Sequence, residues 1–327
     1  MDQRSKEAII AEEFLRTYGR KDLLADWDFM AELIQMCEKI NEQPYEVPEI
    51  KMIGAEELSQ YSHPLTMPME KRIVCEVESF LINFKENNSN KVTVIYFHGG
   101  GYVFQAKYEH LALVNYLAGQ TDCKVLFPVY PMAPNYSFKQ SYEIMVKYYK
   151  SILEHTDPSS IMFIGDSAGG GMALSLTKQL RDGGLPMPAR VILISPALDA
   201  SMSNPEIDAR DLAEIDPMLT HSFYLASEAW AAGKPLNHPY VSPMYGDLKG
   251  LPPMTLYVGT REMLWPDAEK FRELAAEQGV DLDYREWPGM NHCFCIYPIP
   301  EAIETQHEMI DIINRLDREL RDKMSGR

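Results

Sequence analysis

A serine set among glycines stands where an apolar run meets a helical pattern. The run Ile161–Ile164 leads into Gly165–Gly170, which reads Gly-Asp-Ser-Ala-Gly-Gly, and helical spacing continues to about residue 182. A serine on so sharp a strand-to-helix turn projects its hydroxyl above the end of a sheet, and glycine avoids the clashes that a side chain would make there. We therefore expect Ser167 to be a nucleophile rather than an idle serine in a glycine-rich turn.

Three glycines follow another apolar run. Residues His98–Gly101 come directly after Val92–Phe97. Acyl transfer places negative charge on the carbonyl oxygen of the substrate, and backbone N–H groups must already point at that oxygen to stabilise it. We expect His98 to hold this loop by a hydrogen bond rather than to act in catalysis. We assign the oxyanion hole to the N–H groups of Gly100, Gly101 and Ala168.

A serine hydroxyl is a poor nucleophile unless a general base takes its proton. His292 lies on a loop after a predicted strand at 282–287, which is where a base can reach Ser167. The other downstream histidines fall near the proline-rich interval or in the final predicted helix; they are His221, His238 and His307. We therefore expect His292 to be the general base.

The acid that orients this base should follow the apolar run Met254–Val258. Glu262 lies on the loop after that run, whereas Asp267 follows Pro266 at the start of a predicted helix. A carboxylate in the first turn of a helix is a common helix-stabilising residue. Because the acid has only to orient the imidazole and stabilise its charged form, a glutamate suffices. We expect Glu262 to be the acid, with Asp267 as the alternative.

Short apolar runs alternate with helical patterns along most of the chain. Fully apolar strands separated by helices are typical of a parallel sheet that is covered on both faces. Such a sheet brings the loops after its strands to one edge. The predicted strands lie within 72–84 and at Val92–Phe97, Lys124–Val129, Ile161–Ile164, Val191–Ser195, Met254–Val258 and 282–287. The predicted helices of this region are 107–119, 138–154, 168–182, 265–278 and 301–322.

Two regions do not fit this alternation. Residues 5–41 show helical spacing, and the long interval before Met254 is rich in proline. A connection of that length is usually functional or has structure of its own. We expect residues 1–45 to form an N-terminal helical cap segment and residues 46–327 to form the catalytic domain, with a cap insertion at about 200–235. The apolar stripe of the N-terminal helices, which needs a partner, comprises Ile10, Phe14, Leu24, Phe29 and Leu33.

Aromatic side chains near these loops are candidates for a substrate pocket. Two of them follow the oxyanion loop, and two lie in the expected cap insertion. Each is equally suited to packing within the core or the cap, so packing stays the alternative for each of them. We assign substrate binding to Tyr102, Phe104, Tyr224 and Trp230.

The charge of the chain argues against several classes of partner. Lys and Arg total 31 against 48 Asp and Glu, for a formal net charge of −17. A field of that sign repels phosphate backbones and anionic membrane surfaces, so we expect no nucleic-acid partner. No apolar run approaches the length of a membrane span. The start of the chain is charged and amphipathic, so we expect no secretory signal.

The cysteines indicate a reducing compartment. There are five, they are scattered, and an odd number favours reduced thiols in a cytoplasm. Cys293 and Cys295 lie beside His292, but no second Cys or His pair stands at a zinc-binding spacing. We therefore expect a cytoplasmic protein without a metal and without a cofactor.

Taken together, the motifs resemble the hormone-sensitive-lipase-like family of bacterial carboxylesterases, over residues 70 to about 315. The motifs that carry the resemblance are His98–Val103, Tyr130–Pro134, Gly165–Gly170, Ser195–Asp199, Asp216–Met218 and Gly289–His292. The resemblance implies an α/β-hydrolase fold with a mostly parallel eight-stranded sheet, helices on both faces and a helical cap partly built from the N-terminus. Two positions depart from the family pattern. Glu262-Met263-Leu264 stands where the family has Asp-Pro-Leu, and Gln105 stands near a family glycine.

The family implies a serine esterase that hydrolyses short- to medium-chain carboxylic esters through an acyl-enzyme intermediate. We expect a small-molecule ester as substrate and a homodimer as the assembly to test. One alternative is a deacetylase of a small metabolite or sugar, and another is a hydrolase-fold binding protein that has lost catalysis. The binding protein is disfavoured because Ser167, His292 and an acid are all retained. A peptidase or amide hydrolase is a third reading, which matched ester and amide substrates would separate.

Overall fold

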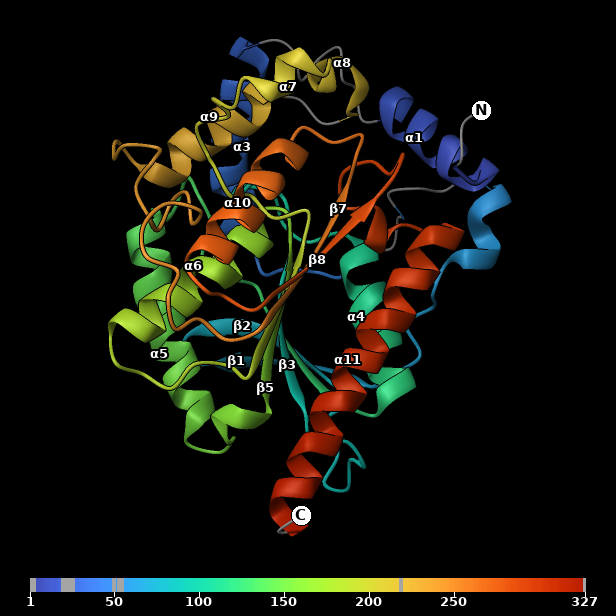
Figure 1. Ribbon diagram of the computed structural model, residues 1–327, viewed down its shortest axis with the longest axis vertical. Coiled ribbons are helices and arrows are strands. Elements are labelled where there is room, and N and C mark those ends of the chain that lie inside the picture. The colour runs from blue at the N-terminus through green and yellow to red at the C-terminus, as the bar shows by residue number, and fades with distance from the viewer. Residues whose placement is uncertain (1–3, 19–26, 49–50, 52–55, 218–219, 326–327) are drawn as a thin grey trace.

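One mixed sheet forms the centre of the protein (Figure 1). The structure is a computed structural model that describes residues 4–18, 27–48, 51, 56–217 and 220–325. The strands found there are β1 (Met69–Val74), β2 (Val77–Ile82), β3 (Thr93–Phe97), β4 (Lys124–Pro128), β5 (Ile161–Asp166), β6 (Arg190–Ile194), β7 (Met254–Gly259) and β8 (Leu282–Trp287). Their order in the sheet is β1-β2-β4-β3-β5-β6-β7-β8.

The strand directions are those of the expected fold. β2 runs antiparallel to both β1 and β4, and the remaining neighbouring pairs are parallel. Every residue of β3, β5 and β7 is buried, which explains why these strands are largely apolar. The prediction of an α/β-hydrolase fold with a mostly parallel eight-stranded sheet is confirmed.

Helices cover both faces of the sheet. One face carries α5 (Phe138–Leu153), α6 (Ala168–Asp182) and α10 (Trp265–Glu277), and the other carries α4 (Tyr108–Thr121) and α11 (Pro300–Ser325) (Figure 1). The apolar core is correspondingly divided into two clusters, one on each side of the sheet. Three short 3-10 helices lie at Glu56–Tyr61, Pro158–Ser160 and Phe294–Ile296.

Five further helices lie over the edge at which the parallel strands end. The N-terminal pair is α1 (Lys6–Tyr18) and α3 (Trp27–Asn41), and the β6–β7 connection contributes α7 (Glu206–Ala209), α8 (Leu212–Ile215) and α9 (Thr220–Ala231) (Figure 1). α3 packs against α9, so the two regions that broke the sequence pattern meet in space. Leu24, which we placed in the apolar stripe, lies outside the described residues.

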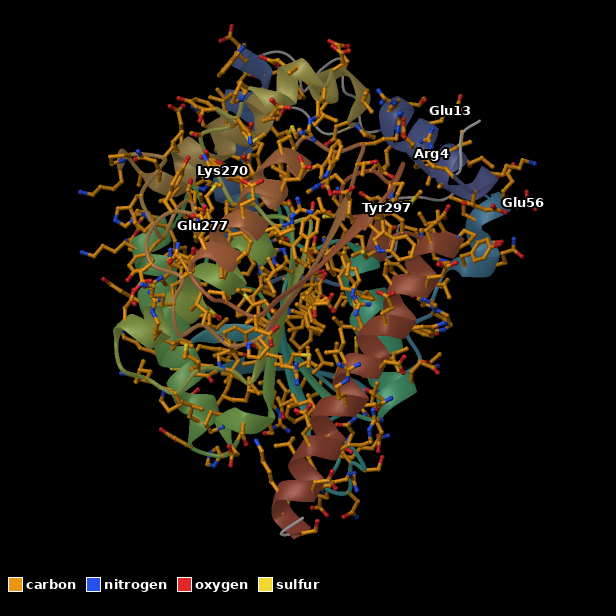
Figure 2. All side chains as sticks on the ribbon, viewed as in Figure 1. Arg4, Glu13, Glu56, Lys270, Glu277 and Tyr297 are labelled. Carbon is orange, nitrogen blue, oxygen red and sulfur yellow. The ribbon has the colours of Figure 1, made fainter. Side chains whose placement is uncertain are left out.

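Many of the carboxylates that make the chain acidic lie on its surface. Glu13, Glu56 and Glu277 are exposed on three different helices (Figure 2). Charges in this position are hydrated and contribute to the net field rather than to the core. Within the described ranges, we find no helix with the length and apolarity that a membrane crossing requires.

Candidate active site

Ser167 lies in a strained turn between β5 and α6. Its backbone adopts φ 52° and ψ −122°, a region that residues with a side chain rarely occupy. The neighbouring glycines permit the turn. A Cβ atom on Gly165 would stand 2.3 Å from the carbonyl oxygen of Gly169, and one on Gly169 would stand 2.0 Å from that of Phe97. A side chain at either position would therefore clash with the backbone, so both positions require glycine.

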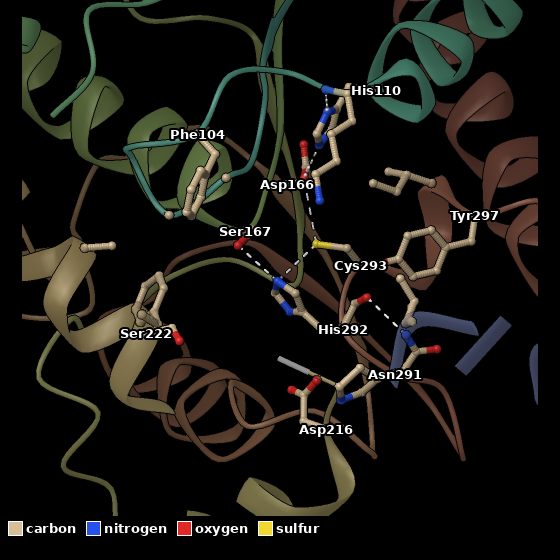
Figure 3. A pocket seen from close by; sticks show the side chains of 18 of the residues that line it. Phe104, His110, Asp166, Ser167, Asp216, Ser222, Asn291, His292, Cys293 and Tyr297 are labelled. Carbon is tan, nitrogen blue, oxygen red and sulfur yellow. Dashed lines mark hydrogen bonds and ion pairs between the residues drawn. The ribbon is translucent and has the colours of Figure 1, made fainter. Parts of the chain in front are cut away.

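The structure brings Ser167, His292 and Glu262 together. Ser167 Oγ lies 3.0 Å from His292 Nε2, and His292 Nδ1 lies 2.6 Å from Glu262 Oε2. Figure 3 shows the serine hydroxyl and the imidazole facing each other within the pocket. All three side chains are buried, and Glu262 is completely so. Both contacts are within hydrogen-bond reach, as a nucleophile, a base and an orienting acid require.

Glu262 raises the pKa of His292. Burial by itself lowers that pKa, but the hydrogen bond and negative charge of Glu262 outweigh burial, and the pKa lies above the ordinary 6.5. The short contact to Glu262 also fixes the tautomer, because a carboxylate accepts the proton on Nδ1 and leaves the Nε2 lone pair toward Ser167. In the neutral imidazole Nε2 therefore carries no proton. Once Nε2 gains a proton, Glu262 stabilises the imidazolium that forms.

The loops that carry the acid and the base lie side by side. The N–H of Arg261 donates to the carbonyl of Met290 at 2.9 Å, and the N–H of Gly289 donates to Thr260 Oγ1 at 2.8 Å. The backbones come so close that a Cβ atom on Gly259 would stand 2.1 Å from the Met290 carbonyl oxygen. These contacts hold the two loops in register after the parallel strands β7 and β8.

Asp267 lies in a different environment from Glu262. It is buried in the first turn of α10, and its Oδ1 accepts a hydrogen bond of 2.8 Å from Asn204 Nδ2. The hydrogen-bond partner of this first-turn carboxylate therefore comes from the β6–β7 connection and not from its own helix. Burial raises the pKa of Asp267 to about 7.

The glycine loop after β3 lies against the nucleophile. Gly100 has φ 120° and Gly101 has φ 60°, which favour glycine, and both residues line the same cavity as Ser167. The carbonyl of Gly100 accepts the N–H groups of Val103 and Phe104, which closes the loop. Within the part of the chain that the structure describes, the Gly100 and Gly101 N–H groups have no acceptor.

Ala168 supplies the third expected N–H group. It is the first residue of α6, so its N–H lies in the turn where a helix has no internal acceptors. The N-terminus of a helix favours negative charge. The three N–H groups assigned to the oxyanion hole therefore belong to two backbone segments that meet at Ser167.

His98 holds the glycine loop, as its expected role requires. Its Nδ1 lies 2.6 Å from the carbonyl oxygen of Gly99, and its ring stacks on Tyr130 with centroids 4.6 Å apart. Burial lowers the pKa of His98 to about 4, so the ring is neutral at physiological pH. His98 does not line the cavity.

Asp166 has a function in the site that the sequence reasoning missed. Its Oδ1 accepts hydrogen bonds from the N–H of Gly99 at 2.9 Å and from the hydroxyl of Tyr96 at 2.6 Å. Its Oδ2 lies 3.2 Å from His110 Nε2. Burial raises its pKa, but the charge and hydrogen bond of His110 outweigh burial and bring the pKa to about 2. Asp166 thereby ties the glycine loop to the nucleophile turn.

A cavity of about 250 Å³ opens above Ser167. Its walls combine the glycine loop, the histidine loop and three of the five helices over the strand ends, which are α1, α3 and α9. Leu15 of α1, Met30 of α3 and Phe223 of α9 contribute to it, as does Asp216. Figure 3 shows Phe104 and Ser222 on the side of the cavity away from Tyr297. Met218 of the Asp216–Met218 motif lies outside the described residues.

Of the four aromatic residues assigned to substrate binding, Phe104 lines the cavity and the other three do not. Tyr102 and Trp230 are buried and stack on each other with centroids 4.6 Å apart. Tyr224 meets Trp27 edge to face at 6.3 Å. These three side chains pack within the core and between α3 and α9, and such packing was the alternative for each.

Cys293 also faces the base. Its Sγ lies 3.3 Å from His292 Nε2, and burial raises its pKa well above the ordinary value, so it stays a thiol. The five cysteines are unpaired, and Cys293 and Cys295 are both buried. No group of three or more potential metal-binding side chains is found among the described residues.

Comparison with known proteins identifies the fold family of the chain and related enzymes. Residues 94–296 match a family described as having the alpha/beta hydrolase fold. An acetyl-hydrolase of Streptomyces hygroscopicus is 34% identical over 206 residues, which are 63% of this chain and 69% of that protein. An esterase of Acinetobacter venetianus is 29% identical over 237 residues, covering 68% of this chain and 75% of that protein.

Solved structures of esterases share the fold of this chain. The crystal structure of an esterase from the bacterial hormone-sensitive lipase family superposes with a TM-score of 0.73 and 27% sequence identity. The superposition covers 90% of this chain and 99% of that one. The family match, the relatives and the eight-stranded sheet agree. The chain therefore belongs to the α/β-hydrolase fold family, and its resemblance to esterases of the bacterial hormone-sensitive lipase family is confirmed.

Proposed function

We propose that this protein is a serine carboxylesterase in which Ser167 is the nucleophile, His292 the general base and Glu262 the acid. The observation that carries the proposal is one chain of contacts, 3.0 Å from Ser167 Oγ to His292 Nε2 and 2.6 Å from His292 Nδ1 to Glu262 Oε2. Carboxylic-ester hydrolysis is the activity class of the relatives, which are named as esterases and acetyl-hydrolases.

In the first half of the reaction, Ser167 Oγ attacks the carbonyl carbon of the ester while His292 Nε2 takes the hydroxyl proton. Glu262 stabilises the imidazolium that forms. The carbonyl oxygen becomes negative and is met by the N–H groups of Gly100, Gly101 and Ala168. When the intermediate collapses, the bond to the alcohol oxygen breaks and His292 gives its proton to that oxygen.

The second half releases the acid. A water molecule attacks the acyl carbon while His292 Nε2 takes one of its protons. The tetrahedral intermediate then collapses, the bond to Ser167 Oγ breaks, and His292 returns a proton to the serine. The free carboxylic acid leaves, and no cofactor takes part in either half.

A short or medium apolar acyl chain suits the cavity. Phe104, Phe223 and Met30 give its walls apolar surface, and the volume of about 250 Å³ is modest. Gln105, the departure near the family glycine, donates from Nε2 to the carbonyl of Ile40 on α3 at 3.3 Å. The glutamine therefore ties the segment after the glycine loop to an N-terminal helix.

The organisation into a cap and a catalytic domain is part of the proposal. Cavity walls from α1, α3 and α9 support a cap built from residues 1–45 and from the insertion at about 200–235. Five unpaired cysteines support a reducing, cytoplasmic setting. A homodimer remains a prediction, which light scattering on the purified protein would check.

Hydrolysis of p-nitrophenyl esters from acetate to laurate tests the proposal. We expect turnover that is highest for short or medium chains and is lost in Ser167→Ala. Ser79→Ala is the matched control, because Ser79 is an equally buried serine on β2 that contacts Val77 and Tyr148. A deacetylase would act on acetate alone. An active amide analogue would favour an amide hydrolase, and no turnover of any ester would favour a binding protein.

A further inference from the structure

Ser195 has a hydroxyl beside the triad that no step of the proposed reaction uses. It follows β6, the strand between β5, which leads to the nucleophile, and β7, which leads to the acid. The side chain is completely buried, and it does not line the cavity. Its φ of 43° is unusual for a residue with a side chain. A buried polar side chain held in such a conformation calls for a physical reason.

The hydroxyl joins the acid to the backbone next to the base. Ser195 Oγ lies 2.8 Å from Glu262 Oε1, and it accepts a hydrogen bond of 3.0 Å from the N–H of Cys293. A backbone N–H can only donate, so the hydroxyl uses a lone pair for Cys293 and gives its single hydrogen to Glu262. The direction of both hydrogen bonds is thereby determined.

Glu262 depends on this donor. Its Oε1 accepts from Ser195 and from the N–H of Gly259 at 2.7 Å, and its Oε2 faces His292. Among the described residues, no Lys or Arg side chain lies within ion-pair distance of Glu262. A fully buried carboxylate without a cation needs hydrogen bonds to remain ionised and oriented. Two donors at Oε1 turn Oε2 toward the imidazole.

We propose that Ser195 is a positioning residue of the triad, which orients Glu262 through Oε1 and holds the histidine loop through Cys293. The proposal rests on the proposed esterase function. In this arrangement one oxygen of Glu262 accepts from Ser195 and Gly259 while the other reaches His292.

Ser195→Ala removes the donor without adding strain, because alanine also has a Cβ atom. We expect kcat to fall about 10- to 100-fold, as for loss of a hydrogen bond to a charged group. KM should stay unchanged, since Ser195 does not line the cavity. The acidic limb of the kcat/KM profile should move down by about half a pH unit or more. Without the Ser195 donor, Glu262 is less well oriented toward His292 and stabilises the imidazolium less, so the pKa of His292 falls.

The controls separate positioning from stability. Ser195→Gly also lacks the hydroxyl, but glycine adopts the positive φ of this position without strain. Its kcat should fall as far as that of Ser195→Ala, while its melting temperature should be no lower. Ser195→Cys keeps a weak donor and should lie between the alanine variant and wild type. Asp166 and Asp216, the other carboxylates that raise the pKa of His292, are unchanged in all three variants. Ser79→Ala should leave kcat and the acidic limb unchanged.

In the Glu262→Gln background, Ser195→Ala should reduce kcat by much less than it does alone, because both residues act through one contact. An active wild-type enzyme whose folded Ser195→Ala variant keeps its kcat, or keeps its acidic limb, would overturn the role of Ser195 and leave the proposed function standing. Absence of ester turnover in the wild-type protein would instead refute both.

Discussion

The substitution Glu262→Gln exchanges one carboxylate oxygen for an NH2 group and leaves the size of the side chain unchanged. The surroundings decide which way the amide turns. Ser195 and Gly259 both donate to the Oε1 position, so the amide oxygen must occupy it. The NH2 group then faces His292 Nδ1, where Glu262 Oε2 now lies at 2.6 Å.

This orientation reverses the tautomer of the base. An NH2 group donates, so His292 must present a bare Nδ1 to it and carry its hydrogen on Nε2. In that tautomer Nε2 has no lone pair for the proton of Ser167. The equivalent change in a triad acid lowers kcat about 10⁴-fold while the geometry stays intact, and we expect a loss of that size here.

Initial rates at saturating p-nitrophenyl ester, corrected by active-site titration, give kcat for the variant. Asp267→Asn is the matched control, since Asp267 is another buried carboxylate after β7 and does not contact His292. Circular dichroism and thermal melting verify that both variants are folded. If Glu262→Gln kept most of its kcat while Asp267→Asn lost it, the acid would be Asp267 and the reasoning from the hydrogen bonds would be refuted.

Three further predictions concern pH, stability and the N-terminal helices. Because Glu262 raises the pKa of His292 above 6.5, kcat/KM should fall as pH drops through a value above 6.5; a flat profile in folded protein would exclude a histidine base. Burial raises the pKa of Asp267 to about 7, so folding takes up a proton between pH 4 and 7, and stability should fall by roughly 1 kcal/mol per pH unit as pH rises there. Urea titrations of Asp267→Asn should show a smaller fall of stability with pH; an unchanged fall would show that Asp267 is not the group that takes up the proton. Deleting residues 1–40 removes Leu15 and Met30 from the cavity wall, so KM should rise and chain-length selectivity should weaken; an unchanged substrate profile would show that these helices serve another purpose.

The sheet was predictable because its central strands are buried on both faces. β3, β5 and β7 are therefore largely apolar runs, and because they run parallel the loops after them share one edge of the sheet. Ser167, Glu262 and His292 each follow a parallel strand, so the strand positions alone predicted that these three residues lie close together. The N-terminal helical pattern over 5–41 likewise corresponds to α1 and α3 within the described residues.

Side-chain direction in the loops was not predictable in the same way. Tyr102 and Phe104 are two residues apart, yet one is buried against Trp230 and the other lines the cavity. The loop has positive φ at Gly100, Gly101 and Tyr102, so neither helical nor strand periodicity applies to it. Asp166 and Ser195 were missed for a related reason. Their partners lie on another strand, on loops after other strands and on α4, which only the assembled fold brings near.

The identity of the nucleophile is the central claim, and covalent labelling tests it most directly. A fluorophosphonate should react with wild-type protein once per chain, and peptide mass spectrometry should place the adduct on Ser167. Ser167→Ala should take up no label and should lose kcat on the order of a millionfold. An adduct on another residue, or an unlabelled protein that still hydrolyses esters, would contradict the assignment of Ser167.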